Sequence, residues 1–175
     1  MIKLLKRLLP SPPAAQPDPP IVPEPEKPTA YTIRLGRTVK TDEAFDAWTS
    51  GDLAKMLAAL NSKSNKIDRH FLLMSIVDAT YKKRSDPEMS RLCRDVAELH
   101  LREFPNMVKP LKKEMGGTLP RVTTFQNYAT LLTELGETDR AIGVCEQAIS
   151  YGLQDGTLAG FEGRIERIKK AKASQ

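Results

Sequence analysis

The sequence contains few of the residues that build disulfide scaffolds and metal centres. Its 175 residues include two cysteines, Cys93 and Cys145, and two histidines, His70 and His100. The cysteines form no CxxC pair and have no histidine at ligand spacing, which argues against a disulfide scaffold and against a zinc module. We expect two buried thiols on apolar helix faces in a reducing cytosol.

Motifs of the common catalytic and phosphate-binding sites are also missing. The chain has no GxSxG, HExxH, GxxxxGK[ST] or GxGxxG pattern, and each histidine lies in an apolar stretch without a carboxylate or cysteine partner. We therefore interpret the histidines as surface or helix-seam residues. The sequence predicts a protein that is not an enzyme and binds neither a cofactor nor a metal ion.

Long hydrophobic runs are absent, and the first nine residues, MIKLLKRLL, form a short amphipathic segment. At 100° per residue its apolar side chains fill one arc and its basic side chains the other. The segment is too short to span a bilayer, and its charges interrupt a signal-peptide core, so we expect a cytoplasmic protein. A membrane-surface or partner-groove anchor here would use Ile2, Leu5, Leu9, Lys3, Lys6 and Arg7; a terminus without any contact is the alternative.

Proline is abundant, but it is concentrated in one place. Nine of the thirteen prolines lie between Pro10 and Pro28. Such a stretch favours extended polyproline II and cannot bury enough apolar surface to order itself. We predict a disordered, Pro-rich linker over 10–30 that acts as a semi-rigid tether, with an SH3 or WW ligand as the less favoured interpretation.

The net charge of +5 and the pI near 9.2 suggest an anionic partner, but the basic residues lie at the ends. Residues 1–10, 31–40 and 161–175 each carry +3, whereas 41–160 carry −2. Lys169, Lys170 and Lys172 suit the C-terminus of a final helix, where cations interact favourably with free carbonyls. Nucleic-acid binding through the basic ends is therefore the least favoured function.

Residues 31–40 alternate briefly between apolar and polar, which predicts an extended arm laid against the body. Helical periodicity follows to the end of the chain, so residues 41–175 are predicted to form an all-α domain. Asp86-Pro87 is typical of a helix start, while Gly116-Gly117, Gly136 and Gly152 mark helix ends. The expected helices span 42–49, 52–61, 65–84, 87–103, 106–115, 120–135, 138–151 and 157–173.

One helical hairpin has a pattern of large and small residues that allows close packing. Phe125, Tyr128 and Leu132 supply bulk on its first helix, Gly136 turns the chain, and small residues lie on both helices. This pattern resembles the tetratricopeptide repeat, a 34-residue helix-turn-helix. The resemblance covers residues 122–155, and its positions are Phe125, Tyr128, Ala129, Leu132, Gly136, Ala141, Cys145 and Ala148.

A weaker, degenerate copy lies upstream, with Cys93 at the position of Cys145. It places Arg84 at the turn glycine, and its other positions are Leu73, Ile76, Val77, Thr80, Met89 and Val96. The segment Asn106 to Met115 lies between the two copies, so we expect it to interrupt the stack. We predict antiparallel helical hairpins stacked as a short tetratricopeptide-like solenoid, with helices 42–49 and 52–61 as one cap and the last helix as the other.

The resemblance implies a ligand site on the inner face made by the first helices of the repeats. Carrying those positions over gives the candidate partner-binding residues Phe71, Met74, Tyr81, Gln126 and Thr130. Asn127 matches an asparagine that holds a peptide carboxylate in some members, but Thr123 and Glu134 stand where basic residues are expected. The predicted function is a non-catalytic adaptor that binds a protein or peptide; the alternative from another class is a peripheral tether with weak contact to an anionic membrane surface.

Overall fold

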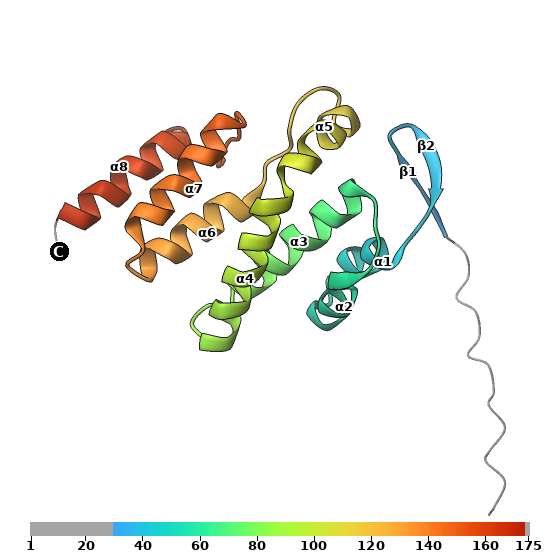
Figure 1. Cartoon of the computed structure of the whole chain (residues 1–175), viewed down its shortest axis with the longest axis horizontal. Helices are drawn as coiled ribbons and strands as arrows, with labels where there is room; N and C mark the ends of the chain where they lie inside the picture. The colour runs from blue at the N-terminus through green and yellow to red at the C-terminus, as the bar shows by residue number, and fades with distance from the viewer. Residues whose placement is uncertain (1–29, 174–175) are drawn as a thin grey trace, which may run out of the picture.

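The computed structural model describes residues 30–173. This part of the chain is mostly helical, with a small two-stranded sheet at its N-terminal end (Figure 1). The prediction of an all-α body is confirmed at this level, while the predicted segments 1–9 and 10–29 lie outside the described residues. The elements are β1 (Tyr31–Arg34), β2 (Arg37–Lys40), α1 (Glu43–Ser50), α2 (Leu53–Ala58), the 3-10 turn η1 (Ala59–Asn61), α3 (Lys66–Tyr81), α4 (Pro87–Glu103), α5 (Pro105–Glu114), α6 (Thr123–Glu134), α7 (Thr138–Ser150) and α8 (Gly160–Ala173).

Local chemistry explains most helix ends. The Asp86 side chain accepts a hydrogen bond from the Glu88 amide, and Pro87 occupies the first helical position of α4, where its missing donor has no cost. Two helices begin three residues later than the sequence predicted. Val122 is extended and buried ahead of α6, and Asp155 holds the Thr157 amide in a turn ahead of α8.

Residues 31–40 fold back on themselves instead of forming one extended arm. β1 and β2 pair antiparallel, with Tyr31 opposite Lys40 and Arg34 opposite Arg37. The two residues between them, Leu35 and Gly36, have φ angles of 54° and 75°, which is the left-handed geometry of a tight hairpin turn. Each strand therefore has the other as its partner, which the alternating pattern alone did not reveal.

The helices pack side by side along the molecule (Figure 1). α3 packs against α4, α6 against α7, and α7 against α8, while α6 also contacts both α3 and α4. α1 and α2 cover the other side of α3. The hairpin predicted over 122–155 is present as α6 and α7, which are joined at Gly136 with a φ of 78°. The β1–β2 sheet and α8 consequently lie at opposite ends of the row.

α5 lies between α4 and α6 in the sequence, but it does not separate these two helices in the structure. It packs against α3 and α4, which leaves α4 and α6 in direct contact. Pro105 begins α5 directly after Phe104, whose ring is fully buried. The expectation that residues 106–115 interrupt the stack is therefore wrong, because this helix folds back along its own hairpin.

The core is continuous through the row. The ring of Phe104 lies 5.2 Å from that of Phe125 and 5.1 Å from that of Tyr151, measured between centroids. These edge-to-face contacts join the α4–α5 corner to α6 and to the end of α7. Both cysteines are fully buried and unpaired.

Candidate functional site

α6 presents a row of polar side chains on one face. Its opposite face is buried in the core through Phe125, Tyr128, Ala129 and Leu132. The helical period places five half-buried polar residues together on the other side, between α3 and α8. These residues are Thr123, Gln126, Asn127, Thr130 and Thr133, and we call them the α6 polar row.

On its α3 side, the α6 polar row is joined to one carboxylate. Asp78 of α3 accepts hydrogen bonds from the Thr123 hydroxyl and from the Asn127 amide, both at 2.7 Å. Burial raises the pKa of Asp78, although these two hydrogen bonds and the charges of Lys82 and Arg121 act in the opposite direction. Asn127 is thus engaged within the protein, where it fastens α6 to α3.

On its α8 side, the row meets a buried ion pair. Arg164 donates from Nη1 to the Thr130 hydroxyl at 2.9 Å and from Nη2 to Asp155 at 3.1 Å. The Asp155 side chain is fully buried. Burial alone would raise the pKa of Asp155, but hydrogen bonds from Thr157 and Arg164 outweigh it and lower that pKa. The pair therefore stays charged and fixes the direction of the Arg164 guanidinium.

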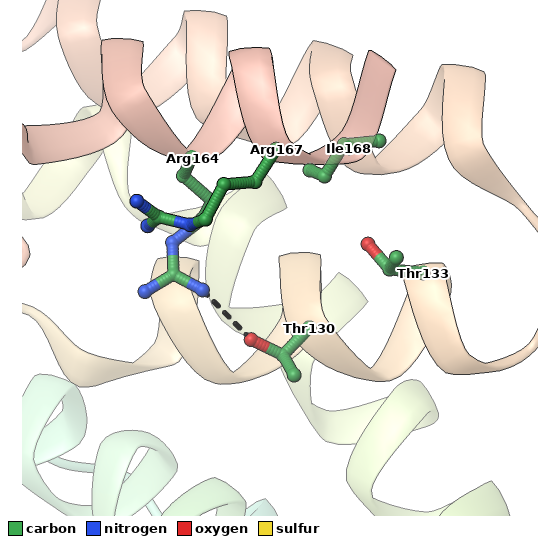
Figure 2. Close-up of a pocket in the computed structure, with 5 residues that line it drawn as sticks. All are labelled: Thr130, Thr133, Arg164, Arg167 and Ile168. Atoms are coloured by element: carbon green, nitrogen blue, oxygen red, sulfur yellow. Dashed lines mark hydrogen bonds between the residues drawn. The ribbon is translucent and has the colours of Figure 1, made fainter. Parts of the chain in front are cut away.

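Between α6 and α8 lies a pocket of about 170 Å³, lined by Thr130, Thr133, Arg164, Arg167 and Ile168. Figure 2 shows both arginines reaching from α8 to the same part of this α6–α8 pocket, with Arg164 bonded to Thr130. The volume is several times the share of one water molecule in the liquid. Within the described chain, the Arg167 guanidinium makes no hydrogen bond or ion pair.

The lining of the α6–α8 pocket determines which ligand it suits. Arg164 has one carboxylate partner, Asp155, while Arg167 adds a second positive charge. The Nε atom of Arg164 is buried and lacks a hydrogen-bond acceptor. Guanidinium groups bind carboxylates through paired, charge-assisted hydrogen bonds. The Thr130 and Thr133 hydroxyls donate to the backbone carbonyls of Gln126 and Ala129, so the arginines supply the donors for a ligand. This arrangement suits one anionic group, with Ile168 offering an apolar contact.

The five predicted partner-binding residues have different surroundings in the structure. Gln126 and Thr130 lie together on the α6 polar row, and Gln126 accepts hydrogen bonds from Arg121. Phe71 packs against Trp48 of α1 with ring centroids 5.0 Å apart, so part of its surface is covered by the N-terminal cap. Met74 is half-buried against the core.

Tyr81, the remaining predicted anchor, is covered by an arginine. The Arg84 guanidinium lies 4.1 Å from the centre of the Tyr81 ring and is also paired with Glu134 at the end of α6. Glu134 occupies a position where the tetratricopeptide resemblance implies a basic residue, and its negative charge is paired with Arg84. One face of the half-buried Tyr81 ring is therefore covered by Arg84.

Sequence reasoning missed the two arginines of α8. It considered the lysines at the end of this helix and left out Arg164 and Arg167. Their spacing of three residues was an available signal, because it places both side chains on one helix face. Their placement in one pocket with Thr130 and Thr133 depends on how α8 packs against the α6–α7 hairpin.

The two histidines are neighbours, although they were expected to lack partners. His70 Nδ1 lies 2.9 Å from His100 Nε2, and His100 Nδ1 lies 2.8 Å from the Thr124 hydroxyl. Both imidazoles are fully buried. Burial lowers the pKa of His70 to about 4 and lowers that of His100 well below its ordinary value. The pair is therefore a neutral hydrogen-bonded part of the core between α3, α4 and α6.

Neither a metal centre nor a membrane-spanning helix is found among residues 30–173. No group of three or more histidine, cysteine or acidic residues in the described part of the chain could hold a metal ion. No helix within residues 30–173 is long and apolar enough to cross a membrane. The predicted anchor residues Ile2, Lys3, Leu5, Lys6, Arg7 and Leu9 lie outside the described residues.

Comparisons with known proteins give one distant relative. The chain is 25% identical over 128 residues to an uncharacterized protein of Aquifex aeolicus (strain VF5). The match covers 71% of this chain and 58% of that protein, so the chain spans little more than half the length of its relative. No protein-family profile matches the chain, and no solved structure matches it.

Proposed function

We propose that the protein is a non-catalytic, cytoplasmic adaptor that binds a peptide along the α6 polar row and holds an acidic group of that peptide in the α6–α8 pocket. The observation that carries this proposal is the pair of arginines, Arg164 and Arg167, that line one pocket together with two threonines of the same row, with Arg164 bonded to the Thr130 hydroxyl. A peptide lying along α6 would meet hydrogen-bonding side chains first and a positively charged pocket at one end.

We further propose that the hairpins are stacked as in a tetratricopeptide-like solenoid, and the packing of the helices supports this. α6 contacts both helices of the preceding hairpin, and α8 packs on α7 as α6 packs on α4. Contacts from Asp78 to Thr123 and from Arg84 to Glu134 indicate that α3 and α6 run in the same direction. Repeated hairpins of this kind create extended faces that bind peptides. We assign α3, α6 and α8 to the inner face.

The ligand is inferred from the charges of this face. An acidic side chain or a terminal carboxylate suits the α6–α8 pocket, because both are anionic and planar like the partners that arginine prefers. Tyr81 and Met74 offer the peptide apolar contacts on α3. Phe71 contributes less, because Trp48 covers part of it.

Selection of peptides from a random display library, followed by titration of the selected peptides, tests the proposal. We expect the selected sequences to share an acidic group. Arg167→Glu should weaken binding by about 1.5 to 3 kcal/mol, roughly 10- to 100-fold in Kd, because it replaces a charge-assisted contact by repulsion. Arg91→Glu is the matched control, since Arg91 is an exposed arginine on α4.

A charge swap makes the test specific to this pocket. Replacing the acidic residue of the selected peptide by lysine should abolish binding to the natural protein and restore part of it in the Arg167→Glu variant. Equal losses in Arg167→Glu and Arg91→Glu would assign the effect to net charge and contradict the proposal. Peptides without any acidic group would contradict it as well.

A second candidate function is attachment to a membrane surface. Residues 1–9 favour it, because their sequence separates Ile2, Leu5 and Leu9 from Lys3, Lys6 and Arg7 around a helix. A single segment of this length supports weak, reversible binding, which salt should reduce. Replacing Leu5 and Leu9 by serine in the full chain should then lower its flotation with phosphatidylserine-containing vesicles.

A further inference from the structure

The β1 strand of the hairpin exposes its apolar side chains and turns polar ones toward the helices, while Val39 of β2 is half-buried. The Tyr31 and Ile33 side chains are 66% and 65% exposed, whereas Thr32 and Arg34, which alternate with them, are half-buried. Leu35 in the turn is 38% exposed. Of the six large hydrophobic residues exposed in the described chain, three belong to this hairpin. The pattern is the reverse of a strand that covers a core.

Buried polar contacts hold the hairpin in this orientation. Arg34 donates to the Asp68 carboxylate from Nε at 3.1 Å and from Nη2 at 2.5 Å. Asp68 is buried and also accepts from Trp48 Nε1 at 3.1 Å. The Leu35 amide donates to Glu114 at the end of α5. An isolated two-stranded hairpin has marginal stability, so these contacts fix which face points outward.

Basic residues lie beside the exposed apolar residues of the hairpin, while acidic residues begin at the start of α1, with Asp42 and Glu43. Lys40 lies opposite Tyr31 in the sheet, Arg37 follows the turn, and both are exposed. Residues 31–40 contain no acidic residue. The nearby Glu114 carboxylate is held by Arg34 and the Leu35 amide. The last turn of α5 beside it adds two exposed lysines and an exposed methionine, namely Lys112, Lys113 and Met115.

Two kinds of occupant suit exposed apolar residues, and the charges distinguish between them. A second copy of this chain would bring like charges together, and the few apolar side chains fall far short of the roughly 800 Å² per partner of a stable interface. An anionic bilayer provides the opposite charge, accommodates apolar side chains at the headgroup boundary and favours tyrosine there. The hairpin lies at the N-terminal end of the row (Figure 1).

We propose that the outward face of the hairpin, formed by Tyr31, Ile33 and Leu35, binds the surface of an anionic lipid bilayer, with Arg37, Lys40, Lys112 and Lys113 at the headgroups. This inference rests on the second proposed function, membrane attachment, but assigns it to a rigid part of the fold. It requires no contact from residues 1–9. Together the two segments provide the two signals that stable membrane attachment needs.

Flotation of the full chain with vesicles of phosphatidylcholine, with and without phosphatidylserine, tests the proposal. Replacing both Tyr31 and Ile33 by serine should lower the partition coefficient on the anionic vesicles at least about tenfold. The matched control replaces Leu135 and Leu158 by serine, because these are exposed apolar residues on other elements, and it should leave binding unchanged. Arg34 and Thr32 are untouched, so the hairpin should keep its place.

The same flotation separates the hairpin from residues 1–9. The hairpin variant and the Leu5→Ser/Leu9→Ser variant are each compared with the natural chain and with the combined variant. The inference is supported if the Tyr31→Ser/Ile33→Ser substitutions lower flotation both in the natural chain and in the Leu5→Ser/Leu9→Ser variant. Loss caused by the Leu5→Ser/Leu9→Ser variant alone would overturn it while leaving membrane attachment intact, and equal flotation of all variants would overturn both.

Fluorescence quenching by brominated lipids gives an independent measurement. In Y31W the introduced indole should be quenched on anionic vesicles, whereas Trp48, which bonds to the buried Asp68, should not. Sedimentation without vesicles tests the other occupant. A dimer that the Tyr31→Ser/Ile33→Ser variant abolishes would assign this face to a second copy and overturn the inference.

Discussion

Buried polar residues give the structure several of its specific contacts. Asp68 receives hydrogen bonds from Arg34, Trp48 and Asn65, and Asp155 receives them from Thr157 and Arg164. Removing one partner from such a cluster leaves a buried charge unpaired, which is far more costly than losing a surface ion pair. The Asp68 cluster joins elements distant in the sequence, and Arg164 extends the Asp155 cluster to Thr130 of α6, so these residues position whole elements as well as stabilising them.

The two histidines make stability depend on pH. Both imidazoles are buried and neutral, and burial lowers the pKa of His70 to about 4. The unfolded chain binds protons near pH 6.5 and the folded chain does not, so stability is complete above pH 6.5 and falls as the pH drops toward 4. We expect His70 alone to account for a loss of the order of 3 kcal/mol across this window.

Urea unfolding at several pH values measures this loss. The His70→Gln/His100→Gln variant keeps neutral hydrogen-bonding groups and should lose most of the dependence between pH 6.5 and 4.5. The lowered pKa values of Glu98, Glu103 and Asp155 place their titration at more acidic pH, which limits their contribution in this window. If the free energy of unfolding of the variant changed with pH as steeply as that of the natural protein, groups other than the histidines would cause the pH dependence.

At the scale of the elements, the hairpin depends on one arginine. Arg34→Ala removes the ion pair with Asp68 and the contact with Glu114. Because a detached two-stranded hairpin is marginal in water, we expect amide hydrogens of residues 31–40 to exchange much faster while those of α6 and α7 stay protected. Arg37→Ala is the control, since Arg37 lies opposite Arg34 in the sheet but is exposed. Similar exchange in both variants would contradict this role.

The elements also show how far the sequence predicts this protein. Helices followed from apolar periodicity and from signals such as Asp86-Pro87, and the bulky residues Phe125, Tyr128 and Leu132 are buried as their spacing indicated. The β1–β2 hairpin did not follow from periodicity, because its turn places Leu35 at a positive φ that leucine rarely adopts. Gly36 was the local signal for this turn, because glycine adopts a positive φ without strain.

The candidate site was predicted in part. Gln126 and Thr130 were predicted from the tetratricopeptide resemblance, and they lie together on one face of α6. The coverage of Phe71 by Trp48 and the convergence of Arg164 on Thr130 join residues 23 and 34 positions apart. Such contacts depend on the angles between helices, which periodicity does not determine.

At the scale of the whole molecule, a row of helices is held together mainly by contacts between neighbours. α4 is flanked by α3 and α6, whereas α7 and α8 form the end of the row. In such structures the ends open more readily than the middle. The two buried cysteines lie in these two regions, Cys93 in α4 and Cys145 in α7.

Thiol labelling in dilute urea reports on this difference. Burial raises the pKa of both thiols, that of Cys145 to about 11, so neither should react with a disulfide reagent in the native protein. We expect Cys145 in the Cys93→Ala variant to react faster than Cys93 in the Cys145→Ala variant, at urea concentrations below the unfolding midpoint. Identical rates would indicate that the row unfolds as one unit.

The positions of the hairpin and of the α6–α8 pocket at opposite ends of the row have a geometric consequence (Figure 1). A bilayer bound at one end and a peptide bound at the other are separated by the packed helices between them. The row then acts as a spacer, because its length sets how far the peptide is held from the lipid. Adding or removing a helical hairpin would change that distance without altering either contact.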